Sequence, residues 1–100
     1  MKDLVADNGA QNQQDADLLR SLAAVHFAYG GMQTAHDLLA LARTIKPDDG
    51  PVLVLSARVA DSLGDFVSAA RLMTAATRLE QKLTSADLAF ARALCSRNRS

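Results

Sequence analysis

Apolar residues return every three or four positions through most of the chain, which is the spacing of amphipathic helices. The β-branched residues are scattered, and no alternating run of them is long enough to predict a strand. The pattern therefore predicts an all-α protein. Its helices are expected from Asp15 to the Gly30-Gly31 pair, from there to Pro47, and then over 52–63, 66–80 and 84–97.

Turn and cap residues stand at the expected helix ends. Gly30 and Gly64 accept the left-handed conformation that ends a helix. Pro47 closes the second helix because it forces Lys46 out of helical dihedral angles. Asp15 is placed to cap the first helix and Asp65 the fourth. Thr84 or Ser85 is expected to cap the fifth, with Asp87 as the acid of a capping box.

The pattern of large and small residues repeats after 34 positions, which is typical of stacked helix-turn-helix units. This period predicts units at 16–49 and 50–83, followed by a capping helix at 84–97, within a single domain at 15–100. The alternative is a bundle of three to five helices in which small residues recur by chance. The matching pairs are Leu19 and Leu53, Ala23 and Ala57, Gly30 and Gly64, Ala35 and Ala69, Leu39 and Met73, and Ala42 and Ala76.

Residues 1–14 are polar and rich in amides, and Asn8-Gly9 is a turn signal. Leu4 and Val5 are the only sizeable apolar residues there, too few to offset the entropy of ordering. The sequence therefore predicts a flexible polar arm at 1–14.

The repeat resembles the tetratricopeptide repeat (TPR). The first unit matches it at the large, small, turn and closing positions, and the second matches it except at Ser56 and at Gln81, where a proline is usual. The resemblance implies a helix-turn-helix solenoid of two repeats with a C-terminal solvating helix. The matching residues are Leu19, Leu22, Ala23, Gly30, Ala35, Leu39, Ala42, Pro47, Leu53, Ala57, Gly64, Phe66, Ala69, Met73 and Ala76.

Among such proteins, the chain is similar to the small TPR chaperones of bacterial type III secretion in length, repeat number, the LLALARTIKP segment and the polar arm. The resemblance implies a cytosolic protein that holds an export-apparatus or needle component before secretion. Arrays of this kind usually need about three units. Two repeats and one helix therefore indicate that the chain self-associates, as a homo-oligomer, or is stabilised by a bound partner.

In TPR arrays the first helix of each unit lines a concave groove. The resemblance implies a partner-binding groove at Arg20, Ala24, Phe27, Val54, Arg58, Asp61, Leu88 and Arg92, with further groove positions at Asp17, Ala28, Pro51, Ser62, Ser85 and Cys95. An apolar floor edged by arginines suits an amphipathic helix or an extended segment that carries carboxylates. The competing interpretation makes the arginines a solvated face and places Phe27 and Leu88 in the core.

The charge pattern bears on the class of partner. Eleven basic and eleven acidic residues give a formal net charge of zero, so nothing favours nucleic acid or an acidic membrane surface. A single cysteine, Cys95, fits a reducing cytosol. The N-terminus lacks the apolar core of a signal peptide. No apolar run approaches the ~20 residues of a membrane-spanning helix. We expect a cytoplasmic protein.

No combination of residues predicts catalysis. His26 and His36 are on different helices, and no further ligands stand at the spacing of a metal site. His26 is expected to pack as an aromatic residue and Cys95 as a small buried one. The sequence predicts no catalytic residue, metal or cofactor, and hence no enzyme. It predicts a protein-binding module, and the resemblance implies a type III secretion chaperone; the alternative is a general TPR scaffold or adaptor without a role in secretion.

Overall fold

The computed structural model describes the backbone of residues 2–79 and 83–99, and the side chains of residues 10–79 and 83–96. Within these ranges the chain is all-α. The helices are α1 (Lys2–Ala28), α2 (Met32–Ile45), α3 (Gly50–Ser62), α4 (Phe66–Arg78) and α5 (Ser85–Arg99). The predicted fold class is thus confirmed at the level of an all-α protein.

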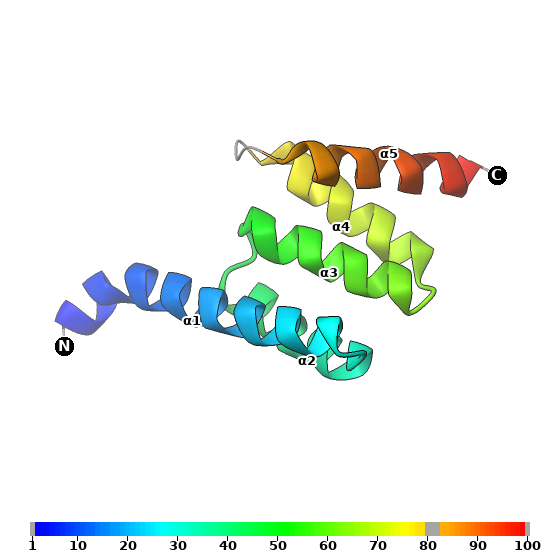
Figure 1. Cartoon of the computed structure of the whole chain (residues 1–100). Coiled ribbons are helices and arrows are strands. Elements are labelled where there is room, and N and C mark those ends of the chain that lie inside the picture. The colour runs from blue at the N-terminus through cyan, green and yellow to red at the C-terminus, as the bar shows by residue number, and fades with distance from the viewer. Residues whose placement is uncertain (1, 80–82, 100) are drawn as a thin grey trace.

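The first four helices form two hairpins, α1 with α2 and α3 with α4 (Figure 1). Both hairpins turn at a glycine with positive φ, 87° at Gly30 and 84° at Gly64. The backbone bonds around them repeat as well. The amide of Gly31 donates to the His26 carbonyl, and the amide of Asp65, 34 residues later, donates to the Ala60 carbonyl. The predicted turn glycines are therefore confirmed, and both helices end in the same hydrogen-bonded motif.

The two hairpins are stacked, because α3 contacts both α1 and α2. The seam is a buried cluster made of Ala23, Ala35, Leu39, Ala42, Val52 and Val59. Arg43 reinforces it by donating from Nη1 to the Ser56 hydroxyl at 2.7 Å, and partial burial lowers the pKa of this guanidinium. Ser56, which departs from the repeat pattern, thus has a partner in the preceding hairpin.

The residues that repeat in the sequence also repeat in burial. The matched alanines are fully buried, Leu39 and Met73 are 0% and 2% exposed, and the two turn glycines are both exposed. The predicted stop before Pro47 and the predicted cap at Asp65 hold too. Lys46 has left helical dihedrals, with φ −141° and ψ 87°, and Asp65 accepts a hydrogen bond from the Ser68 amide. The assignment to the TPR class of solenoids stays a prediction.

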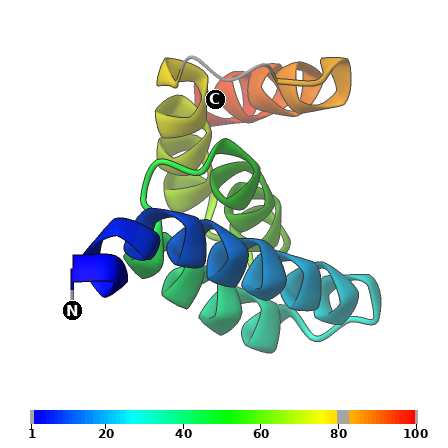
Figure 2. The same cartoon turned by 90° about the vertical axis from the view of Figure 1, so that its left-hand side faces the viewer.

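The fifth helix does not continue the stack in the manner of α3. Figures 1 and 2 show it lying across α4 at the end of the molecule away from α1 and α2. It buries Leu94 against α4, whereas Ala86 and Ala93 are exposed. Their counterparts 34 residues earlier, Val52 and Val59, are fully buried. In sequence α5 follows the repeat, but it packs through a different face.

The first helix is longer than predicted. It begins at Lys2 rather than at Asp15, so the segment expected as an arm is helical from residue 2 onward. Amide side chains support its polar part, since Gln11 and Gln13 each donate to the aspartate four residues later, at 2.9 Å. The expected cap at Asp15 is therefore wrong, because Asp15 lies inside the helix. The flexibility of the arm stays a prediction.

Candidate protein-binding groove

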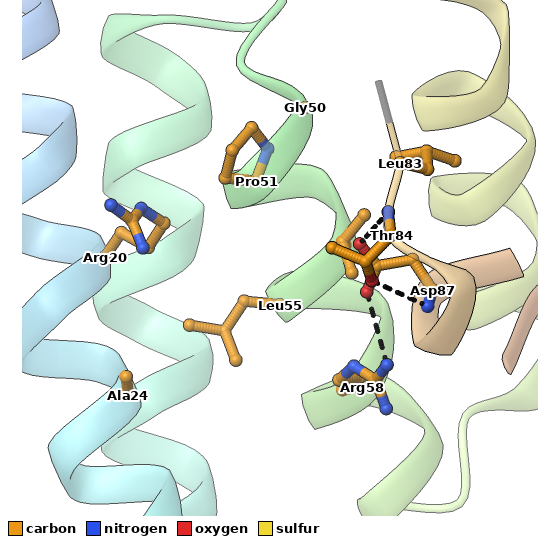
Figure 3. Close-up of a pocket in the computed structure, with 10 residues that line it drawn as sticks. Arg20, Ala24, Gly50, Pro51, Leu55, Arg58, Leu83, Thr84 and Asp87 are labelled. Carbon is orange, nitrogen blue, oxygen red and sulfur yellow. Dashed lines mark hydrogen bonds and ion pairs between the residues drawn. The ribbon is translucent and has the colours of Figure 1, made fainter. Parts of the chain in front are cut away.

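A groove of about 360 Å³ lies where α1, α3 and the start of α5 converge. Figure 3 shows Arg20 on the α1 side, Pro51 and Leu55 on α3, and Thr84 and Asp87 on the α5 side. Most of the surface between these groups is carbon. The lining residues are Arg20, Ala24, Gly50, Pro51, Val54, Leu55, Arg58, Leu83, Thr84 and Asp87.

The cap of α3 shapes the upper wall of the groove. Asp49 accepts from the Val52 amide at 3.1 Å and is only 4% exposed. Gln13 of α1 donates to the same carboxylate at 3.0 Å. Pro51 follows in the first turn of α3, a position where its missing amide hydrogen leaves no bond unmade. These contacts fix the start of α3 relative to α1, and hence the width of the groove at Gly50 and Pro51.

Arg58 lies at the α5 side of the groove and is already engaged. Its Nη2 lies 3.3 Å from Asp87 Oδ1, and its guanidinium carbon lies 4.5 Å from the centre of the Phe90 ring. Asp87 closes a capping box with Thr84, accepting from the Thr84 amide at 3.3 Å, while its own amide donates to the Thr84 hydroxyl at 3.1 Å. The predicted capping box at Thr84 is confirmed. Arg58 therefore holds α5 against α3.

Arg20, on the opposite wall of the groove, differs from Arg58 in its hydrogen bonding. Its Nε is buried and has no hydrogen-bond partner within the described residues. A buried N–H without an acceptor is costly, typically 1–3 kcal/mol, and more for a charged group. A carboxylate brought into the groove would instead meet the guanidinium of Arg20, which lines the groove, through a charge-assisted bond. The groove thus combines apolar walls with one arginine whose bonding capacity is not filled.

The structure gathers four of the eight residues predicted to bind the partner and, of the six further groove positions, Pro51. Arg20, Ala24, Val54 and Arg58 line the groove. Phe27 instead packs beside the buried cluster between the hairpins. Asp61 is partly buried farther along α3 and is not among the lining residues.

Leu88 and Arg92 are exposed and also lie outside the groove, because α5 is rotated relative to α3 and turns Asp87 toward it instead. The competing interpretation placed Phe27 and Leu88 in the core. Phe27 is partly buried against the core, whereas Leu88 is exposed.

Five lining residues were not predicted: Gly50, Leu55, Leu83, Thr84 and Asp87. Thr84 and Asp87 carried a usable signal, since a capping box fixes the start of a helix and places its polar groups there. The other three had none. Gly50 and Leu55 lie in α3 but are not groove positions of the repeat pattern, and Leu83 lies before the start of α5.

The histidines and the cysteine are not brought together with further ligands. Within the described residues, no three His, Cys, Asp or Glu side chains form a group suited to a metal ion. His26 is exposed rather than packed, because α1 turns this position outward. Cys95 is exposed as well, since α5 buries the neighbouring Leu94 in its place. The predicted burial of these two side chains is therefore wrong.

No protein-family profile matches the chain, and neither a curated protein nor a solved structure matches it. Among the described residues, no helix combines the length and the apolar character that a membrane crossing requires.

Proposed function

We propose that this chain is a protein-binding module and that its groove takes a helical or extended segment of another protein. The observation that carries the proposal is the position of Arg20, whose Nε has no hydrogen-bond partner among the described residues, on the wall of the groove beside the apolar surfaces of Ala24, Val54 and Leu55. Apolar walls favour a segment with an apolar face, and the arginine favours a carboxylate on that segment. The role is one of binding, without catalysis.

The finer proposal is a cytosolic chaperone of type III secretion that holds one export-apparatus or needle component. It rests on the sequence resemblance in length, repeat number and the segment 38–47. A chaperone of this kind protects an aggregation-prone amphipathic segment, and the groove offers the apolar contact this requires. The rival proposal is a scaffold or adaptor that uses the same groove for a resident partner.

Site-specific photo-crosslinking in the cells that naturally make the protein tests both levels. A photoreactive amino acid at Ala24 reports on the groove, and the same residue at Ala75, exposed on α4, is the matched control. We expect one discrete adduct from position 24 and none from position 75. Equal labelling at both positions, or none at 24, would contradict the groove. Identification of the adduct by mass spectrometry as an export component supports the chaperone, and a resident protein supports the scaffold.

A further inference from the structure

A second cavity, of about 180 Å³, lies between α2 and α4 where both helices pack on α3. Basic side chains reach it from both helices. His36 and Arg43 come from one side of α2, about two turns apart, and Arg71 comes from α4. The described residues that line it include no carboxylate; they are His36, Arg43, Ala60, Ser68, Arg71 and Leu72. We call it the α2–α4 cavity.

The repeat shows how the same place in the stack looks without the basic groups. Three lining residues have counterparts 34 positions later: His36 and Ala70, Arg43 and Thr77, and Ala60 and Leu94. All three counterparts line a cavity of only about 70 Å³ between α4 and α5. The α2–α4 cavity is therefore larger and basic because of its own residues, and not because the repeat requires a cavity there.

Arg43 is held by a neutral hydrogen-bond partner. Its side chain is partly buried, and this burial lowers the pKa of the guanidinium. Its Nη1 donates to the hydroxyl of Ser56 at 2.7 Å. Among the described residues, no carboxylate forms an ion pair with it. A guanidinium has several N–H donors, so an oxyanion in the cavity can accept from those that Ser56 does not use.

Arg71 and His36 add positive charge from two different helices. Both lie near Asp65, because their charges help to lower the pKa of this carboxyl, after the stronger effect of the hydrogen bonds from Ser68. Asp65 itself is exposed, accepts from the Ser68 amide at 3.1 Å as the cap of α4, and does not line the cavity. It offsets one positive charge, whereas Arg43 and Arg71 supply two. The lining residues thus remain net positive when Asp65 is counted.

From these observations we propose that the α2–α4 cavity binds a phosphate group. The size is suitable, because a water molecule takes about 30 Å³ of liquid volume, and 180 Å³ holds the ion with part of its hydration shell. The charge is suitable as well. A phosphate monoester carries about one and a half to two negative charges at neutral pH, and its oxygens can accept from donors on several sides. A carboxylate, with a single charge, would leave more of the basic surface unpaired.

Phosphate binding here is independent of the proposed function. The α2–α4 cavity and the groove have no lining residue in common, so a result at one site does not decide the other. A bound phosphate would join α2 of the first hairpin to α4 of the second. The ligand would therefore stabilise the stack of the two hairpins, since a solute that binds only the folded chain raises its stability.

Nuclear magnetic resonance provides a site-specific test, because the chain has only two histidines. The imidazole signals of His36 and His26 are followed while sodium phosphate replaces sodium chloride at constant pH and ionic strength. We expect the His36 signals to shift and to saturate. The signals of His26, which is exposed on α1 and does not line the cavity, should stay in place. No saturable shift at His36, or equal shifts at both histidines, overturns the proposal.

Two arginines of α4 form a matched pair of variants. Arg71 and Arg78 are both exposed, but only Arg71 lines the cavity. Loss of a charge-assisted bond should raise the dissociation constant of phosphate roughly 10-fold in Arg71→Gln, and Arg78→Gln should bind as wild type does. Circular dichroism checks that each variant is folded. If Arg71→Gln binds phosphate no more weakly than Arg78→Gln, the proposal is wrong.

Asp65→Asn tests the electrostatic basis with the opposite sign. Asparagine can replace aspartate as a helix cap, so this variant removes the nearby negative charge and keeps the start of α4. We expect it to bind phosphate more tightly than wild type. Weaker binding by the folded variant would contradict the proposed site.

Titrations with other anions identify the form of the ligand. Inorganic phosphate is compared with phosphoserine whose amino and carboxyl groups are blocked. Tighter binding of phosphoserine assigns the cavity to a phosphorylated side chain, and tighter binding of inorganic phosphate assigns it to the free ion; both results support a phosphate site. Acetate is the carboxylate control. Acetate that binds as tightly as phosphate overturns the proposal.

Discussion

The side chain of Gln13 lies 3.0 Å from the carboxylate of Asp49 and joins the first helix to the start of the third. Asp49 is almost fully buried, and its second oxygen accepts from the amide of Val52. A residue from the segment predicted as a flexible arm thus completes the hydrogen bonding of the loop between the two hairpins. The groove begins at the next residues, Gly50 and Pro51.

Replacing Gln13 by alanine tests this link. The change removes a hydrogen bond to a charged, buried acceptor, so we expect the free energy of unfolding to fall by about 1–2 kcal/mol. Urea denaturation followed by circular dichroism measures it. Gln11→Ala is the control, because Gln11 makes a similar but exposed bond only to Asp15 within its own helix. Equal effects of the two changes would show that the contact with Asp49 adds nothing.

Close packing at the small repeat positions gives a second prediction. Ala35 is fully buried in the cluster between the two hairpins, and Ala69 is fully buried in the cluster formed by α3, α4 and α5. Leucine at either position should overpack the contact and lower stability by about 1–3 kcal/mol. Ala75→Leu is the matched control on α4, where the side chain is exposed. A thermal unfolding series compares the three. If Ala35→Leu is as stable as Ala75→Leu, the prediction of close packing at the small repeat positions is wrong.

The attachment of α5 depends on Arg58. Arg58→Ala removes both the ion pair with Asp87 and the stacking on Phe90. Such partly exposed contacts contribute about 0.5–1 kcal/mol each. We therefore expect faster amide hydrogen exchange in α5, while α1 and α2 keep their protection. Arg92→Ala, at an exposed position of α5, serves as the comparison. Unchanged exchange in α5 of the Arg58 variant would argue that Leu94 alone holds the helix.

The cap of α4 predicts a dependence on pH. Hydrogen bonds from the Ser68 hydroxyl and amide to Asp65 lower the pKa of this carboxyl below its ordinary value. A lowered folded-state pKa means that the cap stabilises the protein above the unfolded-state value of ~4, and that this contribution is lost as the pH falls through the folded-state pKa.

Asparagine can cap a helix without titrating at this site. Melting wild type and Asp65→Asn between neutral and acidic pH should therefore show wild type losing its margin over the variant below about pH 4. A margin that is constant with pH would contradict the assignment.

The sequence was most informative where a single residue determines the local conformation of the backbone. Gly30, Gly64, Pro47 and Asp65 act through local dihedral angles or one hydrogen bond, so their roles were predictable. The buried alanines were predictable as well, because the repeat placed them in phase. The N-terminal part of α1 was not, since a polar helix has no apolar period, and one of its contacts, Gln13 with Asp49, is 36 residues away in the chain.

The groove was half predictable for a related reason. Arg20, Ala24, Val54 and Arg58 belong to helices that follow the repeat in space as well as in sequence. Leu88 and Arg92 belong to α5, which has no following helix in the described chain and settles on α4 through Leu94. The rotation of α5 about its own axis depends on tertiary packing, which the periodicity of the sequence does not determine.

The central claim, that the groove binds another protein through Arg20, is tested most directly by the affinity of the partner captured at position 24. Isothermal titration should compare wild type with Arg20→Gln and with Arg92→Gln, an arginine that lies outside the groove. Loss of a charge-assisted bond of about 1.5–3 kcal/mol corresponds to a dissociation constant raised roughly 10- to 150-fold by Arg20→Gln. We expect Arg92→Gln to bind as wild type does. Equal affinities for Arg20→Gln and wild type would contradict the account.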